Sequence, residues 1–303
     1  RISGSGLAFA IASYVLWGFL PLLFLALQPS PPIEIVAWRV VLSLGFCALL
    51  LTATRGWQRF RAILADRAAV LTLSLAAVFI VINWLVYVFA TVSGHVVEAS
   101  LGYFTNPIVT VLLGVVVLRE RLRPAQWVAI AVSAAAVLVL AIGYGSFPWI
   151  AITLAFSFGL YGLTKKRVGP TVDAIGGLTI ETLVLSPVAA GTLIVFALTT
   201  GLSVGTISPW HTVAMASAGV ATAVPLLLFA AASRRLPLVY MGLVQYFAPV
   251  LQLIIGVVFL REAMPLERWL GFGMVWVALI ILTVDMFVHT SRSRSAEAVV
   301  EDL

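Results

Sequence analysis

Three charged side chains, Arg39, Glu98 and Glu181, lie inside or at the edge of long apolar stretches of this sequence. A charge at the centre of a membrane helix costs about 2.5–3.5 kcal/mol, so such a residue usually faces the protein interior and has a partner. We expect Arg39 to bind a carboxylate of a small molecule, and Glu181 to bind an amine or a proton. Glu98 lies at a depth that also permits an ion pair with Arg39. The alternative is structural: these charges lock helices together or reach the membrane surface along their own side chains.

Polar and aromatic side chains recur near the middle of the same stretches. Pro107 and Pro249 each interrupt one of them, and a proline kinks a helix and leaves a carbonyl free to meet a ligand. We therefore interpret both prolines as hinges. The candidate substrate-binding residues are Trp17, Arg39, Asn83, Trp84, Tyr87, Tyr103, Asn106, Tyr161, Glu181, Gln245 and Tyr246. The competing interpretation of the aromatic members is packing in the core, and that of Asn106 is a hydrogen bond between helices.

Motifs of common catalytic sites are absent from the sequence. It has no G-x-x-x-x-G-K-[ST] loop for nucleotide phosphates and no H-E-x-x-H zinc motif. Its single cysteine, Cys47, excludes an intrachain disulfide framework and a multi-cysteine metal site. No Ser–His arrangement or carboxylate pair has a catalytic spacing. We therefore expect no enzymatic activity, no cofactor and no bound metal.

The apolar stretches that carry these residues predict the fold class. The chain is 62% hydrophobic and only 10% charged, with a mean hydropathy of +1.13, a balance that soluble domains do not have. A helix of roughly 20 apolar residues crosses a bilayer. Ten such stretches are found, at 7–27, 33–53, 69–92, 96–118, 125–142, 147–165, 175–200, 211–232, 237–260 and 266–289. We predict an all-α integral membrane protein with ten transmembrane helices.

The net charge of +6 is interpreted as an orientation signal rather than as a sign of nucleic-acid binding. If the N-terminus is cytoplasmic, 15 of the 18 Lys and Arg residues fall in cytoplasmic segments. Cytoplasmic loops of membrane proteins carry this excess of positive charge. We therefore predict that both termini are cytoplasmic, that the lipid bilayer surrounds the chain, and that nucleic acid is not a partner.

The sequence repeats itself after 142 residues. Residues 96–127 align with 238–269 without a gap, and Pro107 falls on Pro249 (249 − 107 = 142). Since each half contains five spans, an odd number, the second half must enter the membrane from the opposite side. Inverted repeats of this kind are typical of secondary transporters, whose substrate site lies at the interface between the halves.

The predicted organisation follows from this repeat. We predict a first five-helix repeat at 7–142 and a second, inverted one at 147–289, arranged around a central cavity. The remaining segment, 290–303, is polar and charged and is predicted to be a disordered cytoplasmic tail.

Several sequence motifs resemble one known family. They are Asn83-Trp84-Leu85-Val86-Tyr87, the run from Val97 to Pro107, the run from Ser157 to Leu163, Glu181-Thr182-Leu183, the run from Pro225 to Phe229, and Gln245-Tyr246. Together they resemble the RarD group of EamA transporters, within the drug/metabolite transporter superfamily. The resemblance covers nearly the whole chain. It implies ten helices in two inverted repeats, a central cavity, alternating access, and movement of small metabolites or drugs across the bacterial inner membrane without ATP.

The sequence thus predicts a secondary transporter for a small, amino-acid-like metabolite or a drug, either coupled to protons or facilitative. Two other function classes stay open at this point: a passive channel or facilitator, and a lipid-handling membrane protein. The expected partners are the small-molecule substrate, protons if transport is coupled, and the bilayer. Either a monomer or a homodimer is compatible with the sequence.

Overall fold

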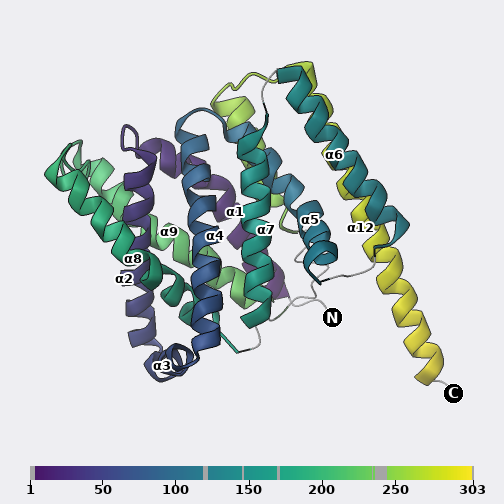
Figure 1. The fold of residues 1–303 in the computed structure, drawn as a ribbon, viewed down its shortest axis with the longest axis horizontal. Coiled ribbons are helices and arrows are strands. Elements are labelled where there is room, and N and C mark those ends of the chain that lie inside the picture. Colours follow the sequence, from purple (N-terminus) through teal and green to yellow (C-terminus); the bar gives the residue numbers. More distant parts are fainter. Residues whose placement is uncertain are drawn as a thin grey trace.

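The protein is described here by a computed structural model, which covers residues 4–118, 122–144, 147–168, 171–233, 235 and 244–301 (Figure 1). This part of the chain is helical throughout and contains no β-strand. The helices are α1 (Gly4–Ala26), α2 (Pro32–Ala53), α3 (Trp57–Ala65), α4 (Arg67–Val92), α5 (Val96–Leu118), α6 (Pro124–Tyr144), α7 (Trp149–Val168), α8 (Ala174–Leu198), α9 (Pro209–Ser233), α11 (Phe247–Ile254), the π-helix η1 (Ile255–Phe259) and α12 (Leu266–Glu301).

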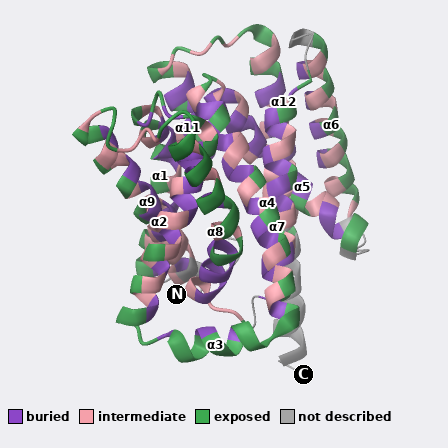
Figure 2. Ribbon diagram, turned by 60° about the vertical axis from the view of Figure 1, so that its left-hand side comes forward, coloured by how far each residue is buried: buried purple, intermediate pink, exposed green. Residues whose placement is uncertain are grey.

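Within these residues, eight helices are long and apolar enough to cross a membrane. Two shorter apolar helices, Trp149–Lys165 and Phe247–Phe259, coincide with the sixth and ninth predicted stretches. Residues 237–243 of the ninth stretch lie outside the described residues. Large apolar side chains point outward, with Leu71 72% and Ile142 79% exposed, and exposed residues are spread over the outer faces of the helices (Figure 2). Such a surface is typical of a protein that contacts lipid.

Two segments differ from the sequence predictions. Helix α3 was not predicted, because it is short and only one face is apolar: Phe60 and Ile63 are buried against the bundle, while Arg59 and Arg61 are exposed. At the other end of the chain, the backbone of α12 continues as helix to Glu301, through most of the segment predicted to be disordered. No proline or glycine follows Gly273 to end this helix.

The helices pair in a pattern with two-fold symmetry. If α1, α2, α4, α5 and α6 are matched in order with α7, α8, α9, α11 and α12, each major contact between the halves has a counterpart. Helix α5 packs on α7 as α11 packs on α1, α4 packs on α7 as α9 packs on α1, and α4 packs on α8 as α9 packs on α2. Helix α2 packs on α8 and α6 packs on α12, and in both of these pairs each helix contacts its own match in the other half. The two halves of the described chain therefore pack as a symmetric pair.

Acidic side chains cap two of the helices in the first repeat. Asp66 accepts hydrogen bonds from the backbone of the first turn of α4. Helix α5 is capped from the other repeat: Glu262, in the loop before α12, accepts from Val96 N at 2.7 Å and from Val97 N at 2.9 Å. A negative charge is favourable at a helix N-terminus, where backbone N–H groups lack partners within the helix. The Glu262 cap thus joins the two repeats at one end of the bundle.

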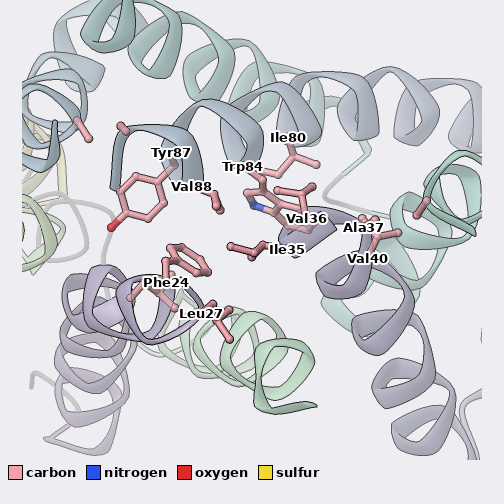
Figure 3. Close-up of a cluster of buried hydrophobic side chains, with 14 of the residues drawn as sticks. Phe24, Leu27, Ile35, Val36, Ala37, Val40, Ile80, Trp84, Tyr87 and Val88 are labelled. Atoms are coloured by element: carbon pink, nitrogen blue, oxygen red, sulfur yellow. The ribbon is translucent and has the colours of Figure 1, made fainter. Parts of the chain in front are cut away.

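The core divides into two main clusters. The larger one lies between α1, α2, α4, α7, α8 and α9 (Figure 3). The second lies between α5, α6, α11 and α12, and α6 and α12 stand together at one side of the bundle in Figure 1. Helices α5 and α7 approach closely because Gly102 has no side chain: a Cβ there would lie 2.7 Å from the carbonyl oxygen of Ala151. The larger cluster holds the candidate site.

Candidate functional site

Arg39 lies inside the larger core cluster and is only 4% exposed. Its Nε donates a hydrogen bond to Thr222 Oγ1 on α9 at 2.6 Å. The guanidinium carbon lies 4.2 Å from the ring centroid of Trp84 and 5.5 Å from that of Phe24. Its Nη1 is buried without a hydrogen-bond partner, and no salt bridge among the described residues includes Arg39. The arginine is therefore a buried positive charge without a counter-ion among the described residues.

Aromatic rings from three helices surround this charge. Phe24 comes from α1, Trp84 and Tyr87 from α4, and Tyr103 from α5. The Tyr87 ring meets Phe24 edge-on at 5.8 Å and Tyr103 edge-on at 5.4 Å. Trp84 and Tyr87 project from the same face of α4 because they are three residues apart, and Figure 3 shows them pointing into the same part of the core as Phe24. We call Arg39 with these four rings the arginine cage.

Asn83 holds part of the cage in place. Its Nδ2 donates to Leu154 O at 3.2 Å and to Ser157 Oγ at 3.1 Å, both on α7. Its Oδ1 accepts a hydrogen bond from the Tyr103 hydroxyl at 3.0 Å. One buried amide thus joins α4, α5 and α7 and fixes the direction of Tyr103. The polar groups of Asn83 are bonded within the protein.

Glu181 is buried on α8 and already has a cationic partner. Its Oε1 lies 2.6 Å from Lys165 Nζ, and its Oε2 accepts a hydrogen bond from the Tyr161 hydroxyl at 3.2 Å. This pair was not predicted from the sequence. The available signal was the four-residue spacing of Tyr161 and Lys165, which places both on one face of α7.

The ion pair that the sequence suggested between Arg39 and Glu98 is not formed. Glu98 instead accepts a hydrogen bond from the backbone nitrogen of Ile150, near the start of α7, at 3.1 Å. Backbone N–H groups in the first turn of a helix need an acceptor, and the carboxylate supplies it. Glu98 also borders a cavity of about 40 Å³, which lies away from the arginine cage. This cavity is lined by Val97, Glu98, Leu101, Leu140, Pro148, Arg268 and Phe272.

Aromatic side chains pack around Arg39 in the region where the sequence predicted a central cavity. The other predicted residues divide between the two core clusters. Trp17 packs against the larger cluster, and its ring centroid lies 5.3 Å from that of Tyr14 and 5.8 Å from that of Phe229. Tyr246 instead lies beside Phe104 in the second cluster at 6.4 Å, so the structure does not bring it to Arg39.

Four more predicted residues lie on α5, on α11 or in the turn before α11. Asn106 is on α5, and its Oδ1 is buried without a hydrogen-bond partner. Pro107 follows it inside α5, which continues through the proline as one helix. The carbonyl of Pro249 on α11 accepts a hydrogen bond from Ser100 Oγ on α5 at 2.8 Å. Gln245 lies in the turn before α11 and interacts with Tyr246.

Comparison with known proteins agrees with the two-repeat architecture. The sequence profile of the EamA-like transporter family matches residues 4–142 and, a second time, residues 147–284. Protein RarD of Streptomyces exfoliatus is 45% identical over 291 residues, covering 96% of this chain and 92% of that protein. Uncharacterized transporter YojE of Bacillus subtilis (strain 168) is 39% identical over 294 residues, covering 96% of this chain and 97% of that protein. A solved crystal structure with 19% identity superposes with a TM-score of 0.60 over 92% of this chain and 98% of that one, which shows a shared fold.

Proposed function

Because this chain belongs to the EamA-like transporter family, we propose that it is a secondary transporter that carries a small, amino-acid-like metabolite or a drug across the bacterial inner membrane by alternating access. Family membership makes the chain a membrane transporter, and the relatives with this architecture cover nearly its whole length. The inverted relation of the two repeats and the ten spans are part of this proposal. They are supported by the odd number of spans predicted in each half of the sequence and by the paired contacts between the halves.

The arginine cage carries the proposal for the substrate. A buried cation without a counter-ion is costly unless something compensates it. Among the described residues, Arg39 Nε bonds to Thr222, whereas Arg39 Nη1 is buried without a hydrogen-bond partner. A carboxylate of the substrate would supply the missing acceptor through a short, charge-assisted pair of hydrogen bonds. The surrounding rings would enclose the apolar part of the same molecule. The cage therefore suits a small organic anion with an apolar or aromatic body.

Glu181 suits the amine of an amino-acid-like substrate. In the present conformation Lys165 places its ammonium on this carboxylate, so the site for a positive charge is already filled by the protein. A substrate amine, or a proton, takes that place only when Lys165 moves away. Arg39 and Glu181 lie on α2 and α8, the helix pair that is its own counterpart in the symmetric packing. An amphoteric substrate would therefore bridge the two repeats.

The proposal is tested by binding and transport with the purified protein. A thermal-shift screen of carboxylates, amino acids and organic cations identifies a ligand, since a compound that binds only the folded state raises the melting temperature. Uptake of that compound into proteoliposomes is then compared for wild type, Arg39→Met and Arg39→Lys. We expect Arg39→Met to weaken binding by at least about tenfold, because a hydrogen bond to a charged group is worth about 1.5–3 kcal/mol.

A second arginine of this chain provides the matched control. Arg235 also stacks on an aromatic ring, with its guanidinium carbon 5.2 Å from the Phe9 centroid, but it is exposed. Arg235→Met should therefore leave uptake unchanged. Wild-type uptake by Arg39→Met would refute the assignment of the anion site. Accumulation that disappears when a pH gradient is collapsed would indicate proton coupling, whereas simple equilibration would indicate a facilitator.

A further inference from the structure

Three buried side chains and one half-buried serine form a continuous hydrogen-bonded chain at the end of the bundle opposite α3. Ser30 Oγ lies 2.8 Å from His211 Nε2 and donates to Ser203 Oγ at 2.7 Å. Ser203 donates to Glu34 Oε1 from its hydroxyl at 2.7 Å and from its backbone nitrogen at 2.8 Å. This chain connects the turn between α1 and α2 with the loop between α8 and α9, and so joins the two repeats. We call it the serine relay.

The direction of each hydrogen bond in the serine relay follows from one contact. His211 Nε2 also lies 3.1 Å from the carbonyl oxygen of Leu27. A carbonyl oxygen only accepts, so Nε2 must carry the hydrogen, and the histidine tautomer is fixed. The donors then run in one direction, from Nε2–H through the hydroxyls of Ser30 and Ser203 to the Glu34 carboxylate. At the other end of the ring, His211 Nδ1 is buried without a partner.

Three of the four side chains in the serine relay are shielded from water, and the adjoining turn and loop carry no ionisable residue. Glu34 is 1% exposed, His211 3% and Ser30 4%. The turn at 27–31 and the loop at 199–208 contain no ionisable residue. The ionisable side chains nearest to this end on the helices packed around it are Tyr14 on α1, Arg39 on α2, Tyr87 on α4 and Glu181 on α8. Arg39 and Tyr87 lie closest to this end of the bundle. Arg39 is five residues after Glu34 on α2, and Tyr87 is five residues before the end of α4, which is about 7 Å of helical rise in each case.

We propose that the serine relay is a proton-binding site that controls the opening of this end of the transporter. The inference rests on the proposed function and extends it, because it names the groups that link protons to the conformational cycle. A proton arrives at Nδ1 of His211, the Nε2 proton passes to Ser30, the Ser30 proton passes to Ser203, and the Ser203 proton passes to Glu34 Oε1. One proton is gained in total, it resides on Glu34, and no electrons are transferred.

Protonation in this way weakens the contact that the serine relay makes between the two repeats. Nε2 of His211 now presents a lone pair to the carbonyl oxygen of Leu27, where it previously donated a hydrogen bond. Glu34 is no longer an anion, so its two hydrogen bonds with Ser203 lose their charge assistance. The serine relay therefore binds a proton less tightly when this end of the bundle is closed than when it is open. By reciprocity, acid shifts the equilibrium toward the open form and alkali shifts it toward the closed form.

A buried reporter on α9 tests this inference without a known substrate. Met215 lies four residues after His211 and is 1% exposed, so a cysteine there reacts with a maleimide only when this end opens. The reporter is Met215→Cys in a Cys47→Ala background, with the full chain in lipid nanodiscs. Because thiol reactivity itself changes with pH, rates are divided by those of Ile207→Cys in the same background, since Ile207 is exposed at 42% on the α8–α9 loop.

We expect the corrected labelling rate to rise by at least about fivefold between about pH 8.5 and about pH 5, because typical couplings between a bound ligand and a conformational change are of this size or larger. His211→Gln keeps an N–H donor near Nε2 but does not titrate, so its rate should stay low at every pH. Glu34→Gln mimics the protonated carboxyl, so its rate should be high at every pH. His95→Gln is the matched control: this half-buried histidine precedes α5 at the same end, outside the relay, and should retain the wild-type pH dependence.

The inference is overturned by any of three results. The first is a corrected labelling rate that does not change with pH in the reporter protein. The second is a pH dependence that persists in both His211→Gln and Glu34→Gln. The third is a pH dependence that disappears in His95→Gln. Should either relay variant fail to fold, Ser203→Ala breaks the relay through a small, partly buried loop residue and should also remove the pH dependence. Since no substrate is used, failure here leaves the Arg39 transport test standing, and failure of that test leaves this one interpretable.

Discussion

Replacement of Arg39 and of Glu181 by methionine should change the stability of the fold in opposite directions. Both side chains are charged and nearly fully buried, but only Glu181 has a salt-bridge partner among the described residues. Arg39→Met removes a hydrogen bond and a cation–π contact, the latter worth about 2 kcal/mol when desolvated. It also removes the desolvation cost of a buried ion, which is several kcal/mol. We expect a net gain of about 1–3 kcal/mol.

Glu181→Met leaves the ammonium of Lys165 without its carboxylate. Breaking a buried pair by removing one partner costs about 3–5 kcal/mol. The Lys165 side chain is 27% exposed, so water screens part of this loss, and a cost of about 2–3 kcal/mol is expected. At about 2 °C per kcal/mol, Arg39→Met should raise the melting temperature by about 2–6 °C and Glu181→Met should lower it by about 4–6 °C.

The assay is thermal unfolding of the purified variants in one detergent, without ligand, followed by tryptophan fluorescence. Arg235→Met serves as the reference for removal of an exposed arginine, which should change stability by less than about 0.5 kcal/mol. The reasoning is refuted if Arg39→Met lowers the melting temperature as much as Glu181→Met does. That result would mean that Arg39 is held by compensated structural contacts, and the argument for an anion site in the arginine cage would be lost.

Three further substitutions test how the helices are positioned. Gly102→Ala places a Cβ 2.7 Å from a backbone oxygen on α7 and should destabilise the fold by about 1–3 kcal/mol, whereas Gly162→Ala meets nothing within 4 Å and should be tolerated in thermal unfolding. Glu262→Ala removes both hydrogen bonds that cap α5 and should cost about 1–2 kcal/mol. Glu267→Ala, a few residues away at the start of α12, should unfold like wild type, and equal losses in the two variants would contradict the capping role. Asn83→Leu breaks the hydrogen bonds that join three helices and should cost at least about 2 kcal/mol, and an unchanged melting temperature would show that this amide does not hold the cage.

The helices could be predicted because apolar length is a local property of the sequence. The fourth stretch, predicted at 96–118, has the same bounds as α5, and the second, predicted at 33–53, differs from α2 by one residue. The repeat also follows from the sequence alone, since residues 96–127 align with 238–269 without a gap. Helix α3 is too short to show this signal, because nine residues with one apolar face do not form an apolar run.

Side-chain partners could not be predicted in the same way, because they depend on which helix faces meet. Arg39 was expected to bind a ligand or to pair with Glu98, and the choice required the positions of α4, α5 and α7. The pair of Glu181 with Lys165 was missed because a basic residue at the end of a span is normally assigned to the membrane surface. The serine relay lies further out of reach: His211 and Ser30 are 181 residues apart in sequence, and no local pattern connects them.

The Glu262 cap has a consequence for any movement between the two repeats. Glu262 belongs to the loop before α12 in the second repeat, and the backbone that it caps belongs to α5 in the first repeat. Any motion that separates the repeats at this end must therefore break both hydrogen bonds and leave a carboxylate and two backbone N–H groups without partners. The free energy of one helix cap thus contributes directly to how easily the two halves of the chain move apart.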